Sequence, residues 1–200
     1  MKNQKNKFLD KFINIASSEG VNESSLLKAS KEAYGEERGY VLDFYNGLYD
    51  AVDALENYFD EQITELVYLS SIKSTTEKIR SCLQARIYAD GNKKPIYQAL
   101  SKFYLTPSGI SLLAKNSWRT VDYIWKLAGD TSLDWNYYSK RSILFTIYTK
   151  NRRYFINSES DSANDLMQKI DIDLDRIKNF NKLKQKFKPE NIPFVRLFIK

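Results

Sequence analysis

The sequence predicts an all-α protein of about eight or nine helices in one domain. Glycine and proline are scarce, with seven and four copies in 200 residues, which favours helices over many tight turns. Apolar residues recur at helical spacing through most segments, and no stretch shows a convincing strand-like alternation. Hydrophobic residues make up 42% of the chain, so a substantial core is expected.

The front of the chain predicts short helices separated by glycines, then a longer one. Gly20 and Gly35 are the expected stops of the first two helices, and Asn22 is the expected N-cap of the second. Residues 48–72 carry a long amphipathic pattern. Short helices followed by a long one resemble the layout of a helix-turn-helix domain joined to a helical ligand-binding domain.

Five further helices complete the prediction. They cover residues 74–89, 94–105, 110–128, about 134–156, and a final stretch that ends before Pro189. Thr131 and Asp134 have the spacing of a capping box at the start of the fourth. That helix is apolar on most sides, which is typical of a central position.

Residue types missing from the chain exclude several functions. There is no histidine, which excludes a Ser-His-Asp triad, a Cys-His pair and imidazole metal sites. A single cysteine excludes an intrachain disulfide. Only a carboxylate-based mechanism remains open to an enzyme, so we expect no enzyme and no metal or cofactor. No apolar run approaches the ~18 residues of a membrane span, and no signal peptide stands out, so we expect a cytoplasmic location.

The net charge of +6 is unevenly distributed. Residues 19–61 contain eleven acids and three bases, whereas the last 25 residues contain eight bases and one acid, Glu190. An acidic front part would be repelled by phosphates, so nucleic acid is not an expected partner despite the helix-turn-helix-like layout.

The basic tail has the pattern of an amphipathic helix. Phenylalanine and leucine share one stripe while lysines lie largely off it, which favours binding to an anionic membrane for residues 178–200. The alternative, packing on the body with solvated lysines, is favoured before residue 178. The expected membrane-binding residues are Lys178, Phe180, Lys182, Leu183, Lys186, Phe187 and Lys188.

Aromatic residues crowd the segment from Trp118 to Tyr148. Trp118 and Trp125 are seven residues apart and share a helix face, which predicts either core or an apolar pocket. Four polar and aromatic residues follow at spacings of 3, 4 and 7 and share a second face, which is either a partner surface or a solvated face. They are Asp134, Tyr137, Tyr138 and Arg141.

The stretch WRTVDYIWKLAGDTSLDWNYYSKRSILFTIYT, residues 118–149, resembles the signature of the coenzyme Q protein nine family, accessory proteins of ubiquinone biosynthesis. Residues 75–87 resemble an arginine-bearing segment of that family more weakly. Indole and phenol are exchanged at Trp135 and Tyr137, and the similarity fades after residue 158. The matching residues are Asp122, Ile124, Trp125, Ala128, Gly129, Asp130, Ser132, Asp134, Asn136, Tyr138, Arg141, Leu144, Ile147 and Tyr148.

The resemblance implies a TetR-like fold that does not act on DNA, with three parts. These are a helix-turn-helix-like part (1–60), a helical lipid-binding core (61–177) and a membrane-binding tail (178–200). It also implies a protein peripheral to the inner (cytoplasmic) membrane that presents an isoprenoid quinone precursor to the di-iron demethoxyubiquinone hydroxylase. The hydroxylase surface would include Tyr137, Tyr138 and Arg141, with Asp134 on the same face.

The isoprenoid lipid would occupy an apolar cavity beside the tryptophans. The residues we assign to that cavity are Trp118, Val121, Trp125, Leu144 and Tyr148. A TetR-like transcriptional regulator with an apolar effector pocket is the alternative, and a homodimer is left open.

Overall fold

The computed structural model describes the backbone of residues 2–88, 93–159 and 163–186, and the side chains of these ranges except 2, 3, 134 and 177–186. Within these ranges the regular structure is helical, with eight α-helices and two short 3₁₀ helices and no strand. The all-α prediction is confirmed.

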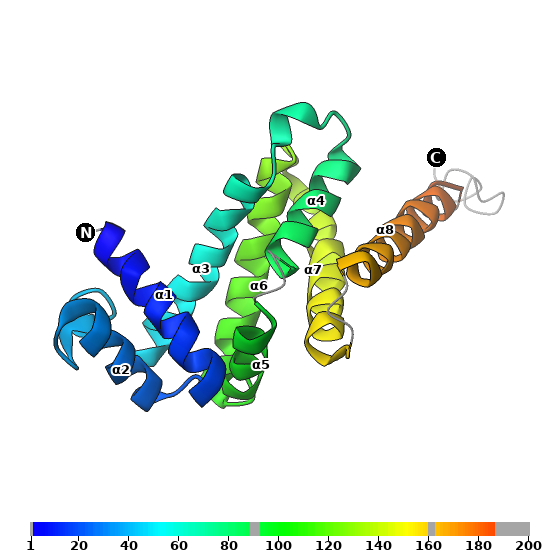
Figure 1. Ribbon diagram of the computed structural model, residues 1–200. Coiled ribbons are helices and arrows are strands. Elements are labelled where there is room, and N and C mark those ends of the chain that lie inside the picture. The colour runs from blue at the N-terminus through cyan, green and yellow to red at the C-terminus, as the bar shows by residue number, and fades with distance from the viewer. Residues whose placement is uncertain (1, 89–92, 160–162, 187–200) are drawn as a thin grey trace.

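The helices follow one another with short connections (Figure 1). Their bounds are α1 Lys2–Glu19, α2 Glu23–Tyr34, η1 Gly39–Leu42, α3 Leu48–Leu66, η2 Leu69–Ser71, α4 Thr75–Ile87, α5 Lys94–Phe103, α6 Pro107–Leu127, α7 Asp134–Asn157 and α8 Ala163–Lys186.

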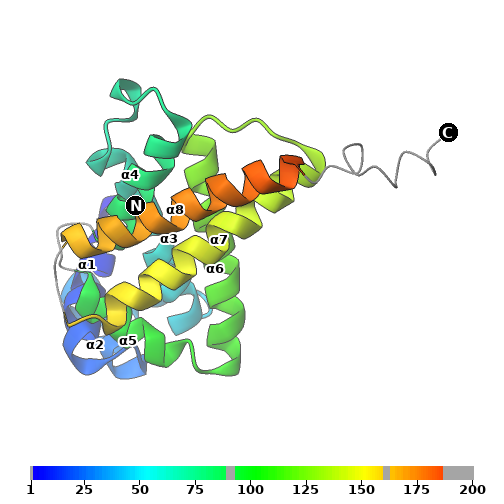
Figure 2. The same cartoon turned by 90° about the vertical axis from the view of Figure 1, so that its right-hand side faces the viewer.

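The long helices α3, α6 and α7 pack with α4 and α5 to form the body. Helix α1 lies against α2, α3 and α5 at one side. Helix α8 packs on α4 and α7 at the other side, and its last turns point away from the body in Figure 1, whereas Figure 2 shows the helix crossing in front of the body. The N-terminal helices and α8 therefore lie on opposite sides of the same bundle.

Local signals explain most of the early helix ends. The Asn22 side chain accepts a hydrogen bond from the backbone N–H of Ser25 at 3.0 Å, which caps α2 as predicted. Gly20 and Gly35 have φ angles of 90° and 83°, a left-handed conformation that glycine adopts without strain. Both predicted stops are confirmed.

Two local predictions are wrong. The helix expected over 48–72 ends at Leu66, where Val67 becomes extended and a 3₁₀ turn follows. Neither glycine nor proline marks this end, so no local signal predicted where the helix stops. At the start of α7, the N-cap is Leu133, which has no side chain able to cap, and not Thr131.

The core runs along α3 and joins both sides of the body. Val52, Leu55, Phe59 and Ile63 are fully buried there, with α4, α5, α6 and α7 contributing further apolar side chains. Since α3 continues through residue 60, the proposed boundary between the front part and the lipid-binding core falls inside a helix.

Candidate functional site

The corner between α6 and α7 is held by a buried arginine. Arg141 on α7 donates from Nε to Asp122 Oδ1 at 2.7 Å and from Nη1 to Asp130 Oδ2 at 3.1 Å. Its guanidinium also stacks on the Tyr137 ring, 3.4 Å from the centroid. Asp122 lies on α6 and Asp130 in the turn, so Arg141 connects all three segments of the corner.

Further polar contacts hold the same turn. Lys140 Nζ lies 2.6 Å from Asp130 Oδ1, and the Ser132 hydroxyl donates to Asp130 Oδ2 at 2.6 Å. Burial opposes ionisation of Asp130, but hydrogen bonds from Lys140, Ser132 and Arg141 outweigh it and lower its pKa to about 2. Asp130 is therefore a carboxylate at neutral pH, and the turn has a fixed geometry.

Three large apolar or aromatic side chains project into solvent at this corner, one from the end of the turn and two from the first turns of α7. Leu133, Trp135 and Tyr138 are 77%, 79% and 58% exposed. Trp135 and Tyr138 are three residues apart on α7, which makes them neighbours on one helix face. We call these three residues the corner patch. Exposed apolar groups gathered on a rigid support are typical of a binding surface.

The four predicted partner-binding residues do not share one exposed face. Tyr138 is exposed, but Tyr137 is half-buried and donates its hydroxyl proton to Asp122 at 2.9 Å. Arg141 is 2% exposed, because two carboxylates draw its guanidinium beneath the turn. The side chain of Asp134 lies outside the described residues. The prediction that all four share one exposed face is therefore wrong for Arg141, whose side chain lies buried beneath the surface.

The five predicted lipid-binding residues lie in or beside the core. Val121, Leu144 and Tyr148 are buried, whereas Trp118 and Trp125 are half-buried. Trp125 donates from Nε1 to the carbonyl of Lys140 at 3.2 Å and thereby also ties α6 to α7. The seven predicted membrane-binding residues, from Lys178 to Lys188, lie outside the described side chains.

An apolar groove opens elsewhere, between the end of α3, α4 and the start of α8. Its volume is about 400 Å³, within the range of small-molecule sites. None of the five predicted lipid-binding residues lines it. Its apolar lining comes mainly from Leu66, Val67, Ile72, Tyr88, Leu166 and Met167.

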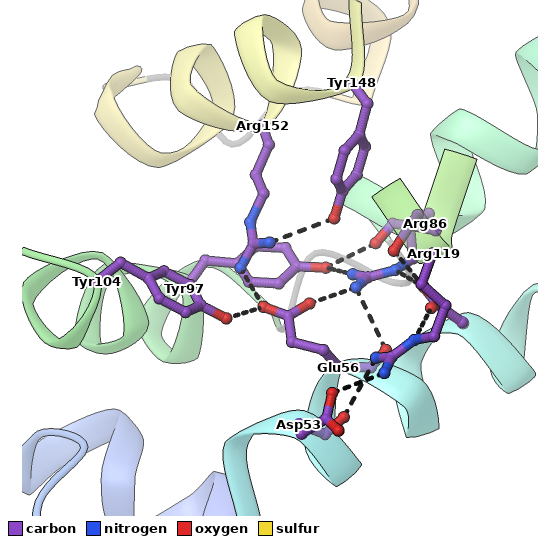
Figure 3. Close-up of polar contacts among 10 residues, drawn as sticks. Asp53, Glu56, Arg86, Tyr97, Tyr104, Arg119, Tyr148 and Arg152 are labelled. Atoms are coloured by element: carbon purple, nitrogen blue, oxygen red, sulfur yellow. Dashed lines mark hydrogen bonds and ion pairs between the residues drawn. The ribbon is translucent and has the colours of Figure 1, made fainter. Parts of the chain in front are cut away.

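A network of buried charges occupies the centre of the bundle (Figure 3). Glu56 on α3 contacts Arg86 of α4 through Oε2, while its Oε1 accepts from Arg152 of α7 at 2.7 Å and from Tyr104 at 2.6 Å. Burial opposes ionisation of Glu56, but the positive charges of Arg152 and Arg86 lower its pKa to about 2. These buried groups are therefore charged and paired.

Asp60, one turn after Glu56, extends this network. Its Oδ1 accepts from Arg86 Nε at 2.6 Å and from the Thr120 hydroxyl at 2.7 Å. Arg86 Nη1 also donates to Tyr97 at 2.6 Å. Glu56, Asp60 and Arg152 were not among the functional residues predicted from the sequence. The sequence contained a signal for two of them, since Glu56 and Asp60 interrupt the apolar stripe of α3. Acidic residues are rarely buried in a core unless they are paired.

The described residues show neither a metal site nor a membrane-spanning helix. That part of the chain contains no cluster of three or more metal-ligating side chains. None of its helices has the length and apolar character needed to cross a bilayer. The described residues thus form an all-α domain with the corner patch on its surface.

Comparison with known proteins shows similarity to one protein family. Residues 110–181, from α6 into α8, match the COQ9 family model. Over 129 residues the chain is 27% identical to the probable ubiquinone biosynthesis protein coq9, mitochondrial, of Dictyostelium discoideum. That alignment covers 63% of this chain and 41% of the relative. The segment with the signature, residues 118–149, lies within the part of the chain that matches the COQ9 family, as predicted, and the chain matches less than half the length of this relative.

Proposed function

We propose that this protein is a non-catalytic accessory protein of ubiquinone biosynthesis that presents an isoprenoid quinone precursor to the di-iron demethoxyubiquinone hydroxylase. The observation that carries this proposal is the corner patch. It lies in the segment that matches the family, at a corner held by six charged or polar groups. A rigid surface loses little entropy on binding, which suits a docking function.

The hydroxylase would dock on Leu133, Trp135 and Tyr138. Tryptophan and tyrosine are the residue types most enriched among interface hot spots. Tyr137 and Arg141 would act from beneath, by holding α7 at the angle that displays the patch. This proposal modifies the expected role of Arg141, since a side chain 2% exposed offers a partner little surface.

The isoprenoid chain would enter the groove between α4 and α8. Its apolar lining suits a hydrocarbon, and Leu166 and Met167 come from the first turns of α8. The same helix leads on toward the basic residues 178–200, for which we propose membrane binding. Trp118, Val121, Trp125, Leu144 and Tyr148 would support the wall opposite the groove or line a deeper part that opens with lipid.

The wider architecture fits the same proposal. We propose a TetR-like fold, in which the N-terminal helices precede a helical ligand-binding body, here with an acidic front part unsuited to DNA. The protein would work at the inner (cytoplasmic) membrane as a peripheral protein. Its parts would be residues 1–60, 61–177 and 178–200, with α3 shared by the first two.

The test is direct. Protein purified under native conditions should carry isoprenoid lipid by mass spectrometry, and it should co-purify with the hydroxylase of the same organism. Met167→Trp should fill the groove and reduce the bound lipid, whereas Met167→Leu, a similar volume, should retain it. Protein that carries no lipid and does not bind anionic liposomes would contradict the proposal.

A further inference from the structure

A second hollow lies between α5, α6 and α7, away from the groove and the corner patch. Its volume is about 600 Å³, and its wall combines apolar side chains with hydroxyls and two arginines. It lies near the C-terminal end of α7, whereas the corner patch lies at the N-terminal end. Tyr138 and Arg153 are 15 residues apart on that helix, which corresponds to ~22 Å.

The charge of this hollow is positive. Arg152 and Arg153 line it, and none of its eleven lining residues is acidic. Arg152 is buried and pairs with Glu56 (Figure 3). Arg86 also contacts Glu56 but has a second carboxylate partner in Asp60. Arg153 is exposed. Because Glu56 balances the charge of Arg152, the positive charge open to a ligand comes mainly from Arg153, and it attracts a negatively charged group.

One polar side chain in the wall has no protein partner. Ser117 is 1% exposed, and its buried Oγ makes no hydrogen bond to the described residues. The nearby hydroxyls of Ser101 and Thr149 bond to carbonyls of their own helices, at 2.7 and 2.8 Å. A buried hydroxyl without a partner costs stability, unless a ligand or water completes its hydrogen bonding.

We propose that this hollow is a binding site for a small amphipathic carboxylate. The carboxylate would lie against the arginines and accept a hydrogen bond from Ser117, and the apolar part of the ligand would cover Leu105, Leu113 and Ile156. Leu105 is exposed in the ligand-free structure, so covering it removes apolar surface from water. The site is independent of the lipid groove and of the proposed hydroxylase surface.

Isothermal titration of the full chain with octanoate and with cinnamate tests the proposal. At least one carboxylate should bind, and about tenfold or more tightly than octanol or octylamine, since charge-assisted hydrogen bonds are about twice as strong as neutral ones. If neither carboxylate binds, or if octanol binds as well as octanoate, the proposal is wrong.

Substitutions locate the ligand. Ser117→Ala should weaken carboxylate binding by about two- to tenfold while leaving the melting temperature unchanged or raised, because its Oγ has no partner to lose. Arg153→Gln should weaken binding by about two- to fivefold, and the exposed Arg38→Gln should have no effect. Unchanged affinity in both Ser117→Ala and Arg153→Gln would overturn the proposal. So would a loss of binding in Met167→Trp, because that result would place the ligand in the groove beside α8.

Discussion

Arg152 Nη2 donates a hydrogen bond to Glu56 Oε1 over 2.7 Å, joining two residues 96 positions apart in the centre of the bundle. Arg152 lies in the segment that matches the COQ9 family, and Glu56 lies outside it. Buried charges must be paired to be tolerated. The segment that matches the family therefore depends on α3 for the carboxylate that pairs with its buried arginine.

Replacing Glu56 should destabilise the protein strongly. In Glu56→Gln the guanidinium groups of Arg86 and Arg152 lose the carboxylate they share, and breaking a buried ion pair costs about 3–5 kcal/mol. Urea unfolding followed by circular dichroism measures this loss. Glu65→Gln, an exposed position on the same helix, should change the free energy of unfolding by less than about 0.5 kcal/mol. Equal effects of the two substitutions would contradict the role of the network.

The protein should lose stability in acid. Folding lowers the pKa of Glu56 from 4.5 to about 2 and that of Asp130 from 3.8 to about 2. Because the folded state holds these protons less tightly, their stabilising contribution is complete above the ordinary pKa values and falls as the pH drops from about 4.5 toward 2. Urea midpoints measured at several pH values should show this decline, and Glu56→Gln should show a shallower one. A flat profile down to pH 2 would contradict the assigned charges.

The corner arginine should matter for stability more than a surface residue does. Arg141→Ala removes the bonds to Asp122 and Asp130, and we expect a loss of about 1–3 kcal/mol. Arg141→Lys should recover only part of it, because lysine cannot contact both carboxylates with a planar fork. Thermal denaturation measures both. An unchanged melting temperature in Arg141→Ala would mean that the corner is held by other contacts.

Substitutions in the corner patch should affect partner binding and not stability. Trp135→Ala and Tyr138→Ala remove exposed side chains, so the melting temperature should change little. Hydroxylase binding should weaken by at least about tenfold for each, the typical size of a hot-spot effect. Surface plasmon resonance with the purified hydroxylase measures this, and Ser142→Ala, exposed on the same helix, is the matched control. Wild-type affinity in both variants would remove the patch from the proposal.

The basic tail should be separable from the body. Removal of residues 178–200 should abolish binding to anionic liposomes in flotation assays and leave a cooperative thermal transition. Replacing Lys182, Lys184 and Lys186 by glutamine should weaken liposome binding in the full chain, since each lysine near an anionic surface contributes about 1 kcal/mol. A truncated chain that fails to fold would instead assign the tail to the core.

Much of the architecture could be predicted from local sequence. Asn22, Gly20 and Gly35 act through contacts with their own neighbours, so their caps and stops were predictable. The end of α3 at Leu66 was not, because Val67 and Tyr68 carry no local stop signal and the turn there follows from tertiary packing. The predicted cap of α7 at Thr131 was wrong because the helix begins after Leu133, whose side chain cannot form a capping hydrogen bond.

The candidate site likewise has features that were predictable from local sequence and features that were not. Residues 118–149 carried the family signature in sequence, and the resemblance led to the prediction that Tyr138 and Arg141 bind a partner. Spacing on one helix could not show that Arg141 turns inward while Leu133 and Trp135 remain exposed, because Asp122 and Asp130 come from outside that helix.

The sequence by itself determined the all-α class, the absence of histidine chemistry and the similarity to the COQ9 family, since these depend on composition and on residues close together in the chain. Only the tertiary structure decided which charges are buried, which aromatic side chains face solvent and where the hollows lie. Glu56, Arg86 and Arg152 illustrate the physical reason. A charge is tolerated in the core only beside its counter-charge, and these partners are brought together by packing helices that are distant in sequence.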